Sequence, residues 1–320
     1  MPPAARARDI LSVTDFLPDL PKLLARAAKL KAERRHGRSP KTLMRKSAAL
    51  IFEKSSTRTR TSFEVGVHDL GGAALYLSAK DLQLGRGETI ADTARVLSRY
   101  VDLIVYRAYR HSDMVELAKW ASIPVINALD DLEHPCQIAA DLLTLYEAWK
   151  GKFSGRRLAY IGDGNNVLHS LLLGSAGVGL DLSVATPPAY RPRPEVVAEA
   201  TALGRRTGAH FRFTDRPEEA ARGADAVYTD VWVSMGDEAE AGAREVAFKG
   251  YQVNDALLDL GAKGAFAMHD LPAHRGQEIT DAVMDGDRQV IWDQAENRLH
   301  AQKALIEWVF AAPTRRRSRH

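Results

Sequence analysis

The 320-residue chain has a single cysteine, Cys136, and lacks any long apolar segment. One cysteine cannot form an internal disulfide, so we expect the protein to work in a reducing compartment, the cytoplasm. No apolar run approaches the roughly 20 residues that a membrane-spanning helix needs, and the first residues lack the apolar stretch of a secretory signal. We therefore expect no membrane partner.

A net positive charge is lacking outside the end of the chain. The net charge is +3, but four arginines lie in the last six residues, so the rest of the chain has a net charge of −1. We interpret residues 313–320 as a solvated basic tail rather than a nucleic-acid contact. No zinc-ligand spacing, RNA-binding aromatic motif or basic recognition helix is present, so we expect no nucleic-acid partner.

Short apolar segments alternate with segments of helical periodicity along the whole chain. In the first half the apolar segments have the length and branched residues of buried strands, and they cover residues 48–52, 73–77, 102–106 and 124–129. A second series follows a proline-started helical segment at 135–151 and ends with QVIWD at 289–293. Strands that alternate with helices predict an α/β fold with helices on both faces of parallel sheets.

Two such series predict two doubly wound parallel-sheet domains joined by long helices. We expect a first domain over residues 1–148 and a second over 149–295, with a C-terminal helix at 296–312 that packs back on the first domain. Ligands of open parallel sheets lie outside the carboxyl ends of the strands. The turns that follow the strands should therefore carry the function.

The turn after the first strand, EKSSTRTRTSFE at 53–64, is rich in hydroxyls and arginines. Unpaired N–H groups at a helix start favour anions, and Ser56, Thr57 and Thr59 can donate to phosphate oxygens. The guanidinium of Arg58 is a planar fork that matches a phosphate edge. The alternative is a helix cap with surface arginines, but one Ser or Thr would be enough for a cap.

Three later turns of the first half add further polar candidates. Gln83 lies in a glycine-flanked loop and alone is a weak signal. Arg107 just after the third strand is a candidate second cation, although a surface arginine is the alternative. His134 and Gln137 start the long helix and could both donate to a developing oxyanion, or could merely cap that helix. Cys136 beside them is expected to be packed.

The second half carries its own set of strand-end residues. Gly162 and Gly164 suggest a dinucleotide loop, but Val167 stands where the third glycine belongs and no acidic residue ends the next strand, so we reject that interpretation. Asn165 and Asn166 instead suggest a contact to a polar small molecule. The remaining candidates follow later strands, and a carboxylate among them could pair with an ammonium group: Asp230, Ser234, Met235, His269, Asp270 and Arg298.

Taken in order, the motifs S-T-R-T-R, D-L-Q-L-G, H-P-C-Q, G-D-G-N-N, D-V-W-V-S-M-G, H-x-L-P and A-E-N-R resemble those of the ornithine carbamoyltransferases. The resemblance runs from about residue 8 to residue 310. The S-T-R-T and H-P-x-Q elements are typical of the aspartate/ornithine carbamoyltransferase superfamily, and S-M-G favours its ornithine branch. The resemblance implies transfer of a carbamoyl group from carbamoyl phosphate to ornithine, giving citrulline and phosphate, without a metal or organic cofactor.

The resemblance also implies roles for single residues and an assembly. The phosphate of carbamoyl phosphate would be held by Ser56, Thr57, Arg58 and Thr59. Its carbamoyl end would be held by Arg107, His134, Gln137, Leu271 and Arg298. Ornithine would be bound by Asn166, Asp230, Ser234 and Met235. Gln83 would reach the site of a neighbouring subunit in a homotrimer or a higher multiple of trimers.

The chain departs from the family pattern H-C-L-P, because Asp270 stands where the family has a cysteine beside the reacting amine. A charged carboxylate would stabilise the ammonium form of the amine, raise its pKa and shift the pH optimum upward. Three interpretations follow. Asp270 is tolerated with ornithine as substrate and could serve as a proton acceptor; it marks another amine, such as a diamine or a modified ornithine; or the chain is a non-catalytic paralogue that binds carbamoyl phosphate.

Overall fold

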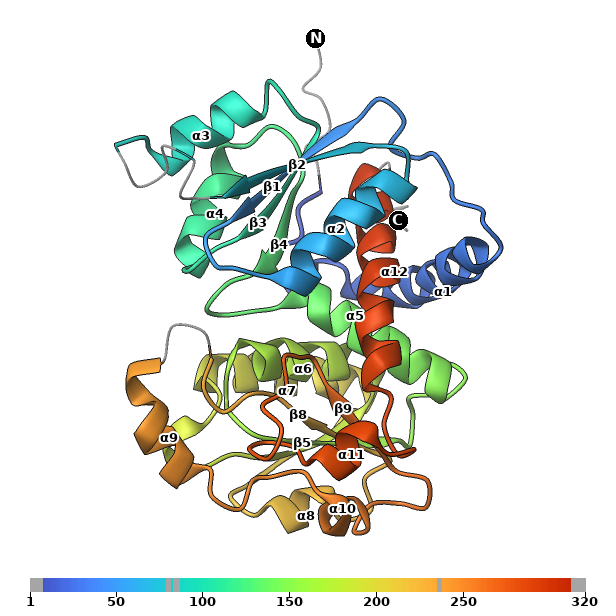
Figure 1. Ribbon diagram of the computed structural model, residues 1–320, viewed down its shortest axis with the longest axis vertical. Helices are drawn as coiled ribbons and strands as arrows, with labels where there is room; N and C mark the ends of the chain where they lie inside the picture. Colours follow the sequence, from blue (N-terminus) through green and yellow to red (C-terminus); the bar gives the residue numbers. More distant parts are fainter. Residues whose placement is uncertain (1–7, 79–81, 83–86, 235–237, 312–320) are drawn as a thin grey trace, which may run out of the picture.

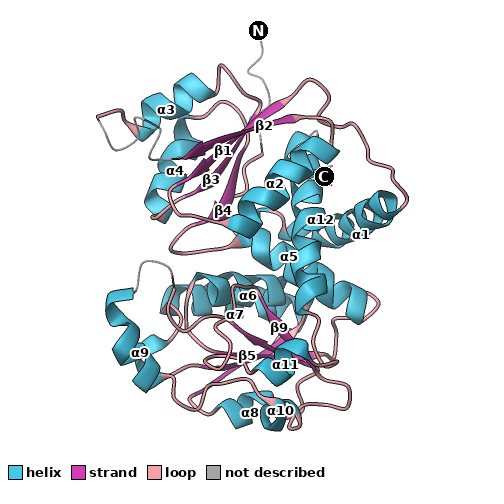
Figure 2. Cartoon of the chain, in the orientation of Figure 1, coloured by secondary structure: helices cyan, strands magenta, loops and turns pink. Residues whose placement is uncertain are grey.

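The computed structural model describes residues 8–78, 82, 87–234 and 238–311. In this part of the chain, two parallel sheets with helices on both faces lie one above the other (Figures 1 and 2). The predicted class, an α/β protein with two doubly wound parallel sheets joined by long helices, is confirmed.

The first sheet has the strand order β2-β1-β3-β4. Its strands are β1 (Ser47–Phe52), β2 (Ala73–Ser78), β3 (Leu103–Arg107) and β4 (Val125–Leu129). Its helices are α1 (Leu20–Arg35), α2 (Thr57–Asp69), α3 (Ile90–Leu97), α4 (His111–Trp120) and α5 (Pro135–Ala148), preceded by short 3-10 helices at Val13–Asp15 and Leu17–Asp19. The four strands lie where the apolar segments predict them, shifted by at most one residue at either end.

Both faces of this sheet are buried, which explains why its central strands are apolar along their whole length. Leu50 and Val105 point into a core shared with α1, α2 and α5. Ile51 and Ile104 point to the opposite face, into a smaller core under α3 and α4. Figure 1 shows these two helices on the far side of the sheet from α2.

The second sheet has the order β7-β6-β5-β8-β9. Its strands are β5 (Arg157–Ile161), β6 (Asp181–Ala185), β7 (Phe211–Thr214), β8 (Ala226–Thr229) and β9 (Phe266–His269). The helices around it are α6 (Asn166–Val178), α7 (Pro194–Thr207), α8 (Pro217–Ala221), α9 (Ala241–Ala247), α10 (Asp255–Leu258) and α11 (Asp281–Asp285), with 3-10 helices at Pro188–Tyr190 and Glu238–Glu240.

The end of the chain differs from the prediction. The segment QVIWD forms only a single bridge, between Gln289 and Ala267, and then enters helix α12 (Ile291–Phe310). An apolar run of this length cannot be distinguished from the start of a buried helix by pattern alone. The helix therefore starts five residues earlier than expected. It runs from the second sheet to the first and packs on α5, α1 and α2 (Figure 1).

Each sheet has one point at which the chain reverses the direction in which it adds strands. In the first sheet this point lies between β1 and β3, and in the second it lies between β5 and β8. At this point the turns that leave the two neighbouring strands run in opposite directions, so a crevice opens between them in which a ligand can bind. The two crevices carry S-S-T-R-T and Arg107 on one sheet, and G-D-G-N-N and Asp230 on the other.

Candidate active site

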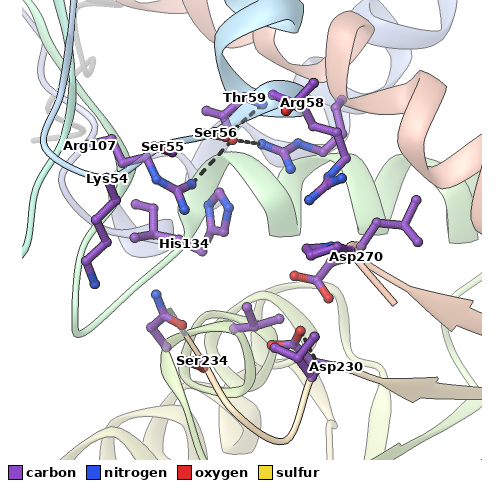
Figure 3. Close-up of a pocket in the computed structure, with 18 of the residues that line it drawn as sticks. Lys54, Ser55, Ser56, Arg58, Thr59, Arg107, His134, Asp230, Ser234 and Asp270 are labelled. Atoms are coloured by element: carbon purple, nitrogen blue, oxygen red, sulfur yellow. Dashed lines mark hydrogen bonds between the residues drawn. The ribbon is translucent and has the colours of Figure 1, made fainter. Parts of the chain in front are cut away.

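A cavity of about 580 Å³ lies where the two crevices meet (Figure 3). Most of the candidate residues chosen from the sequence line it: Ser56, Thr57, Arg58, Thr59, Arg107, His134, Asn166, Asp230, Ser234, Asp270, Leu271 and Arg298. Gln137 and His269 do not line it, and Gln83 and Met235 lie outside the described residues. Lys54, Ser55 and His274 also line it and were not chosen.

The wall from the first sheet is centred on Thr59, in the first turn of α2. The hydroxyl of Ser56 accepts the Thr59 N–H at 3.2 Å and thereby caps the helix. The Thr59 hydroxyl in turn accepts from Arg298 at 2.6 Å and from Arg107 at 3.5 Å. One threonine therefore joins the helix start, the end of β3 and the middle of α12.

Three guanidinium groups, of Arg58, Arg107 and Arg298, are collected at this wall. Burial first, and then the positive charges of Arg298 and Arg58, lower the pKa of Arg107 to about 10. Burial is also the main reason that the pKa of Arg58 and Arg298 is lowered. Like charges are costly together in a buried place, and a bound anion would remove that cost. The Nε groups of Arg107 and Arg298 have no partner within the described chain, so donors remain for such an anion.

His134 is held beside the arginines by the loop at 130–134. The carboxylate of Asp130 accepts the Leu132 and Glu133 N–H groups at 2.8 Å, and Ser170 accepts the His134 N–H at 2.8 Å. The His134 side chain makes no helix-capping bond, which rules out the capping alternative. Burial, with Arg298 and Arg107, lowers its pKa well below 6.5, so the ring is neutral near pH 7 and can donate one hydrogen bond to an oxygen.

Gln137 does not have the geometry that we expect from the sequence. Its Nε2 donates to Asp141 at 2.8 Å, and its buried Oε1 has no partner among the described residues. Asp141 also accepts from Gln294 at 2.7 Å and from Tyr228 at 2.9 Å. One of the two Nε2 N–H donors of Gln137 is thus used by Asp141, and the unpartnered atom is the Oε1 acceptor. An acceptor suits an amide N–H of a ligand rather than an oxyanion.

The opposite wall is acidic. Asp230 follows β8, where its carboxylate accepts from Asn165 at 2.7 Å and from the Val231 N–H at 2.7 Å. Asp270 follows β9 and faces Asp230 across the lower part of the cavity (Figure 3). Burial first, and then the charge of Asp270, raise the pKa of Asp230 well above 3.8. Asn165 therefore positions this carboxylate, a role that the sequence pattern does not reveal.

His269 supports Asp270 from behind rather than facing the cavity. It is fully buried, and its Nδ1 accepts the Leu271 N–H at 2.8 Å while Nε2 lies 3.0 Å from Glu278. Both ring nitrogens are used, so His269 offers no lone pair to a metal even though its ring lies near Asp230 and Asp270. Leu271, which follows, has φ of 61°, a conformation that is costly for a leucine and is typical of functional turns.

The loop after β8, which presents Ser234 to the cavity, is anchored by α9. Arg244 is buried, and its Nη1 donates to Asp163 at 2.8 Å and to the Trp232 carbonyl at 3.0 Å. Asn166, at the start of α6, donates to the Asp130 carbonyl at 2.6 Å and so links the two domains beside the cavity. Gly164 approaches the backbone of 190–192 so closely that a Cβ would lie 2.3 Å from Arg191, which explains this glycine without a nucleotide.

Geometry and charge together define the class of site. A hydroxyl-lined helix start with three arginines suits a phosphorylated small molecule, and a pair of carboxylates on the opposite wall of the same cavity suits an ammonium group. The neutral His134 lies beside the arginines and lines the same cavity. Such a site fits an enzyme that transfers a group from a phosphorylated donor to an amine.

Comparison with known proteins agrees with this class. Residues 8–147 match the carbamoyl-P binding domain of aspartate/ornithine carbamoyltransferase, and residues 154–309 match its Asp/Orn binding domain. The ornithine carbamoyltransferase of Methanoculleus marisnigri is 53% identical over 300 residues, covering 93% of this chain and 96% of that protein. The ornithine carbamoyltransferase of Halalkalibacterium halodurans is 53% identical over 94% of both chains.

Solved structures give the same result. The ornithine carbamoyltransferase from Pyrococcus furiosus superposes with a TM-score of 0.89 at 50% identity, covering 94% of this chain and 96% of that one. The anabolic ornithine carbamoyltransferase from Campylobacter jejuni gives 0.88 at 38% identity, covering 95% and 99%. The chain belongs to the aspartate/ornithine carbamoyltransferase family.

Proposed function

We propose that this protein transfers the carbamoyl group of carbamoyl phosphate to the side-chain amine of L-ornithine, giving L-citrulline and phosphate. The observation that carries the proposal is the division of charge across one cavity, with Arg58, Arg107 and Arg298 on one wall and Asp230 with Asp270 on the other. Membership of the family and relatives named ornithine carbamoyltransferase support it.

The first wall would hold carbamoyl phosphate. The start of α2, with Ser56, Thr57, Arg58 and Thr59, offers N–H groups, hydroxyls and a guanidinium to the phosphate. Arg107 and Arg298, both aimed at Thr59, and the neutral ring of His134 would donate to the carbonyl oxygen as it becomes an oxyanion. The free Oε1 of Gln137 would accept an N–H of the carbamoyl group, and Leu271 would contact that group from β9.

The second wall would hold ornithine. Asp230 and Asp270 would face its side-chain amine, and Asn166, Ser234 and Met235 would bind the rest of the amino acid. Carbamoyl transfer to an amine changes no oxidation state, so the proposal needs no redox cofactor. The barrier lies in the oxyanion, in the leaving phosphate and in the positioning of two substrates between two domains.

The proposal includes an assembly and a location. Gln83 would complete the site of a neighbouring subunit in a homotrimer or a multiple of trimers, and the enzyme would be cytoplasmic. No helix in the described part of the chain is long and apolar enough to cross a membrane.

The test is turnover with a panel of amines from about pH 6 to about pH 10, which spans the ionisation of an aliphatic amine. Purified protein with carbamoyl phosphate and ornithine should form citrulline and phosphate in equal amounts. Turnover of putrescine or N-acetylornithine without turnover of ornithine would show that Asp270 marks another acceptor. Binding of carbamoyl phosphate without turnover of any amine would show a non-catalytic paralogue.

A further inference from the structure

The loop at 130–134, which carries His134, is organised around the carboxyl group of Asp130. Asp130 is fully buried. Its Oδ1 accepts the Glu133 N–H at 2.8 Å, and its own N–H donates to the Glu133 carbonyl at 3.0 Å. The N–H of His134 donates to Ser170 at 2.8 Å. The peptide group that leads into His134 is therefore fixed both at its carbonyl and at its N–H, which determines where the His134 side chain begins.

The second oxygen of this carboxyl group faces the start of α4. Oδ2 of Asp130 accepts from Asn127 at 2.8 Å and lies 2.7 Å from Nδ1 of His111. Because an ionised carboxylate only accepts hydrogen bonds, Nδ1 of His111 carries the hydrogen of this contact. The His111 backbone N–H donates to Asp131 at 2.6 Å, so the residue is bound to the loop twice. The His111 side chain is 29% exposed and can therefore exchange a proton with solvent.

Asp130 also contacts the second domain. Its carbonyl accepts from Asn166 at the start of α6, at 2.6 Å. The neighbouring Asp131 lies 3.3 Å from Arg193, which precedes α7. Asn166 lines the same cavity as His134. Asp130 is therefore the residue that joins the His134 loop of the first domain to the amino-acid side of the cavity.

The charged groups around His111 in the described chain come from its own helix, from the loop at 130–134 and from the segment before α7. They are Arg110 and Asp113, which bind each other, then Asp130, Asp131 and Glu133, and then Arg193, which binds Asp131. The hydrogen bond to Asp130, with the negative charges of this loop, raises the pKa of His111 above 6.5, although burial opposes the shift. The ring thus keeps a positive charge to higher pH than an isolated histidine does.

We propose that His111 is a positioning residue for carbamoyl transfer, because its charge holds the Asp130 carboxylate and thereby fixes the loop that directs His134 toward the carbonyl oxygen. This proposal rests on the proposed function, since it concerns the step in which His134 donates. His111 does not line the cavity and acts only through Asp130. Without His111, the buried carboxylate would keep only amide donors among the described residues, from Asn127 and the backbone, and an uncompensated buried charge is costly.

A purely structural role for this contact would change a different quantity. If the pair of His111 and Asp130 only stabilised the fold, its loss would lower the Tm and leave kcat of the folded protein unchanged. If the pair directs His134, its loss lowers kcat more than it weakens binding of carbamoyl phosphate, because the oxyanion exists only in the transition state. The two roles can therefore be separated by comparing kcat with the Kd of carbamoyl phosphate.

The experiment compares wild type with His111→Asn and His111→Ala. Asparagine can place an uncharged N–H near the position of Nδ1, whereas alanine offers no donor. His210→Ala is the matched control, because His210 also contacts an aspartate, Asp181, at 3.2 Å but is 85% exposed. At pH 6.5, kcat should fall about tenfold in His111→Ala and about threefold in His111→Asn, with the Kd of carbamoyl phosphate within about threefold of wild type.

The control should match wild type in both quantities. An unchanged kcat in His111→Ala, or a loss of kcat no larger than the loss of affinity for carbamoyl phosphate, overturns the proposal. Absence of citrulline from wild type would refute the proposed function instead, whereas citrulline formation with an unchanged kcat in His111→Ala would refute the positioning role alone.

The dependence on pH gives a second readout with a defined sign. The charge of His111 is present at low pH and is lost as pH rises through its raised pKa. The ratio of kcat between wild type and His111→Asn should therefore be largest near about pH 6 and approach one by about pH 9, since both side chains then offer a neutral donor. Glu133, whose pKa burial raises to about 6, is present in both proteins, so its titration cancels from the ratio.

The Tm reports the same contact without turnover. Because the folded pKa of His111 is raised, wild type should be more stable than His111→Asn below about pH 6.5, and the difference should disappear as pH rises above the folded value. A Tm difference and a kcat ratio that both stay constant with pH would show that the charge of His111 does not hold Asp130, which contradicts the proposal.

Discussion

The two walls of the cavity are built in the same way and carry opposite charge. Each lies at the point where a doubly wound sheet reverses its strand order, and each uses the turn that leads into a helix. The first wall gathers three arginines around one threonine, and the second gathers two aspartates beside one asparagine. The fold therefore supplies the place for a ligand, and only the residues at the turns decide which ligand is bound.

The comparison extends to how each wall is held. On the cationic wall the buried guanidiniums of Arg107 and Arg298 bond to the Thr59 hydroxyl and, within the described residues, to no carboxylate, which leaves their charge available to an anion. On the acidic wall the carboxylate of Asp230 accepts from an amide and a backbone N–H, neither of which neutralises it. Neutral partners orient the charged groups on both walls and leave the charge for the substrate.

The largest effect is expected from the cationic wall. Arg107→Gln removes the buried guanidinium that we propose as a donor to the carbonyl oxygen, so kcat/KM should fall by about 10³. Citrulline formation measures this loss. Arg110→Gln is the matched control, because Arg110 is exposed and, among the described residues, its guanidinium bonds to Asp113 at the start of the same helix. Equal activity of the two variants would show that Arg107 does not contact the donor substrate.

The acidic wall should respond differently. Asp230→Asn removes the charge that holds the ammonium group, so kcat/KM for ornithine should fall by about 10². The affinity for carbamoyl phosphate, measured by calorimetry, should change less than about threefold. Asp259→Asn, an exposed carboxylate paired with Arg288, is the control. An equal weakening of the interaction with ornithine and with carbamoyl phosphate would mean that the two walls do not act separately.

Asp141 beneath Gln137 gives a pH-dependent prediction. Burial raises its pKa to about 7 in the folded protein. The unfolded chain loses this proton near the ordinary value, so the carboxyl lowers stability progressively as pH rises from about 4 to about 7. The Tm of Asp141→Asn relative to wild type should therefore increase across that range and level off above it. A constant Tm difference from pH 4 to pH 8 would show that Asp141 is ionised throughout.

The smallest effect is expected from the basic tail. Residues 315–320 contain four arginines, one more than the cationic wall contributes. If local placement rather than total charge binds the donor, deletion of residues 314–320 should leave kcat/KM within about twofold of wild type. A loss of tenfold or more would assign the tail a part in the site.

The local sequence pattern was enough to predict site residues whose position depends on a single turn. Strand ends and helix starts placed Arg58, Arg107, His134 and Asp230 at one edge of their sheets, because parallel strands bring their carboxyl ends together. The local pattern was not enough to predict the orientation of a side chain that is set by residues far away in the sequence. The direction of the Gln137 amide is set by Asp141, which itself binds Tyr228, 87 residues away.

The same limit applies to two other features. The first turn of α12 reads as a strand because Val290, Ile291 and Trp292 form a short apolar run, and only packing against α5 identifies it as a helix. Asp270 was visible as a departure from the family pattern, but its pairing with Asp230 follows from the adjacency of β8 and β9. Strand order is a property of the fold and could not be read from either segment.

The most direct test of this division of charge is a crystal structure with carbamoyl phosphate and 2-aminopentanoic acid bound together. The account predicts the phosphate at the start of α2, in contact with Arg58, the carbonyl oxygen near Arg107, and the end of the amino-acid side chain directed toward Asp230 and Asp270. A phosphate bound away from α2, or an amino-acid side chain directed away from both aspartates, would contradict it.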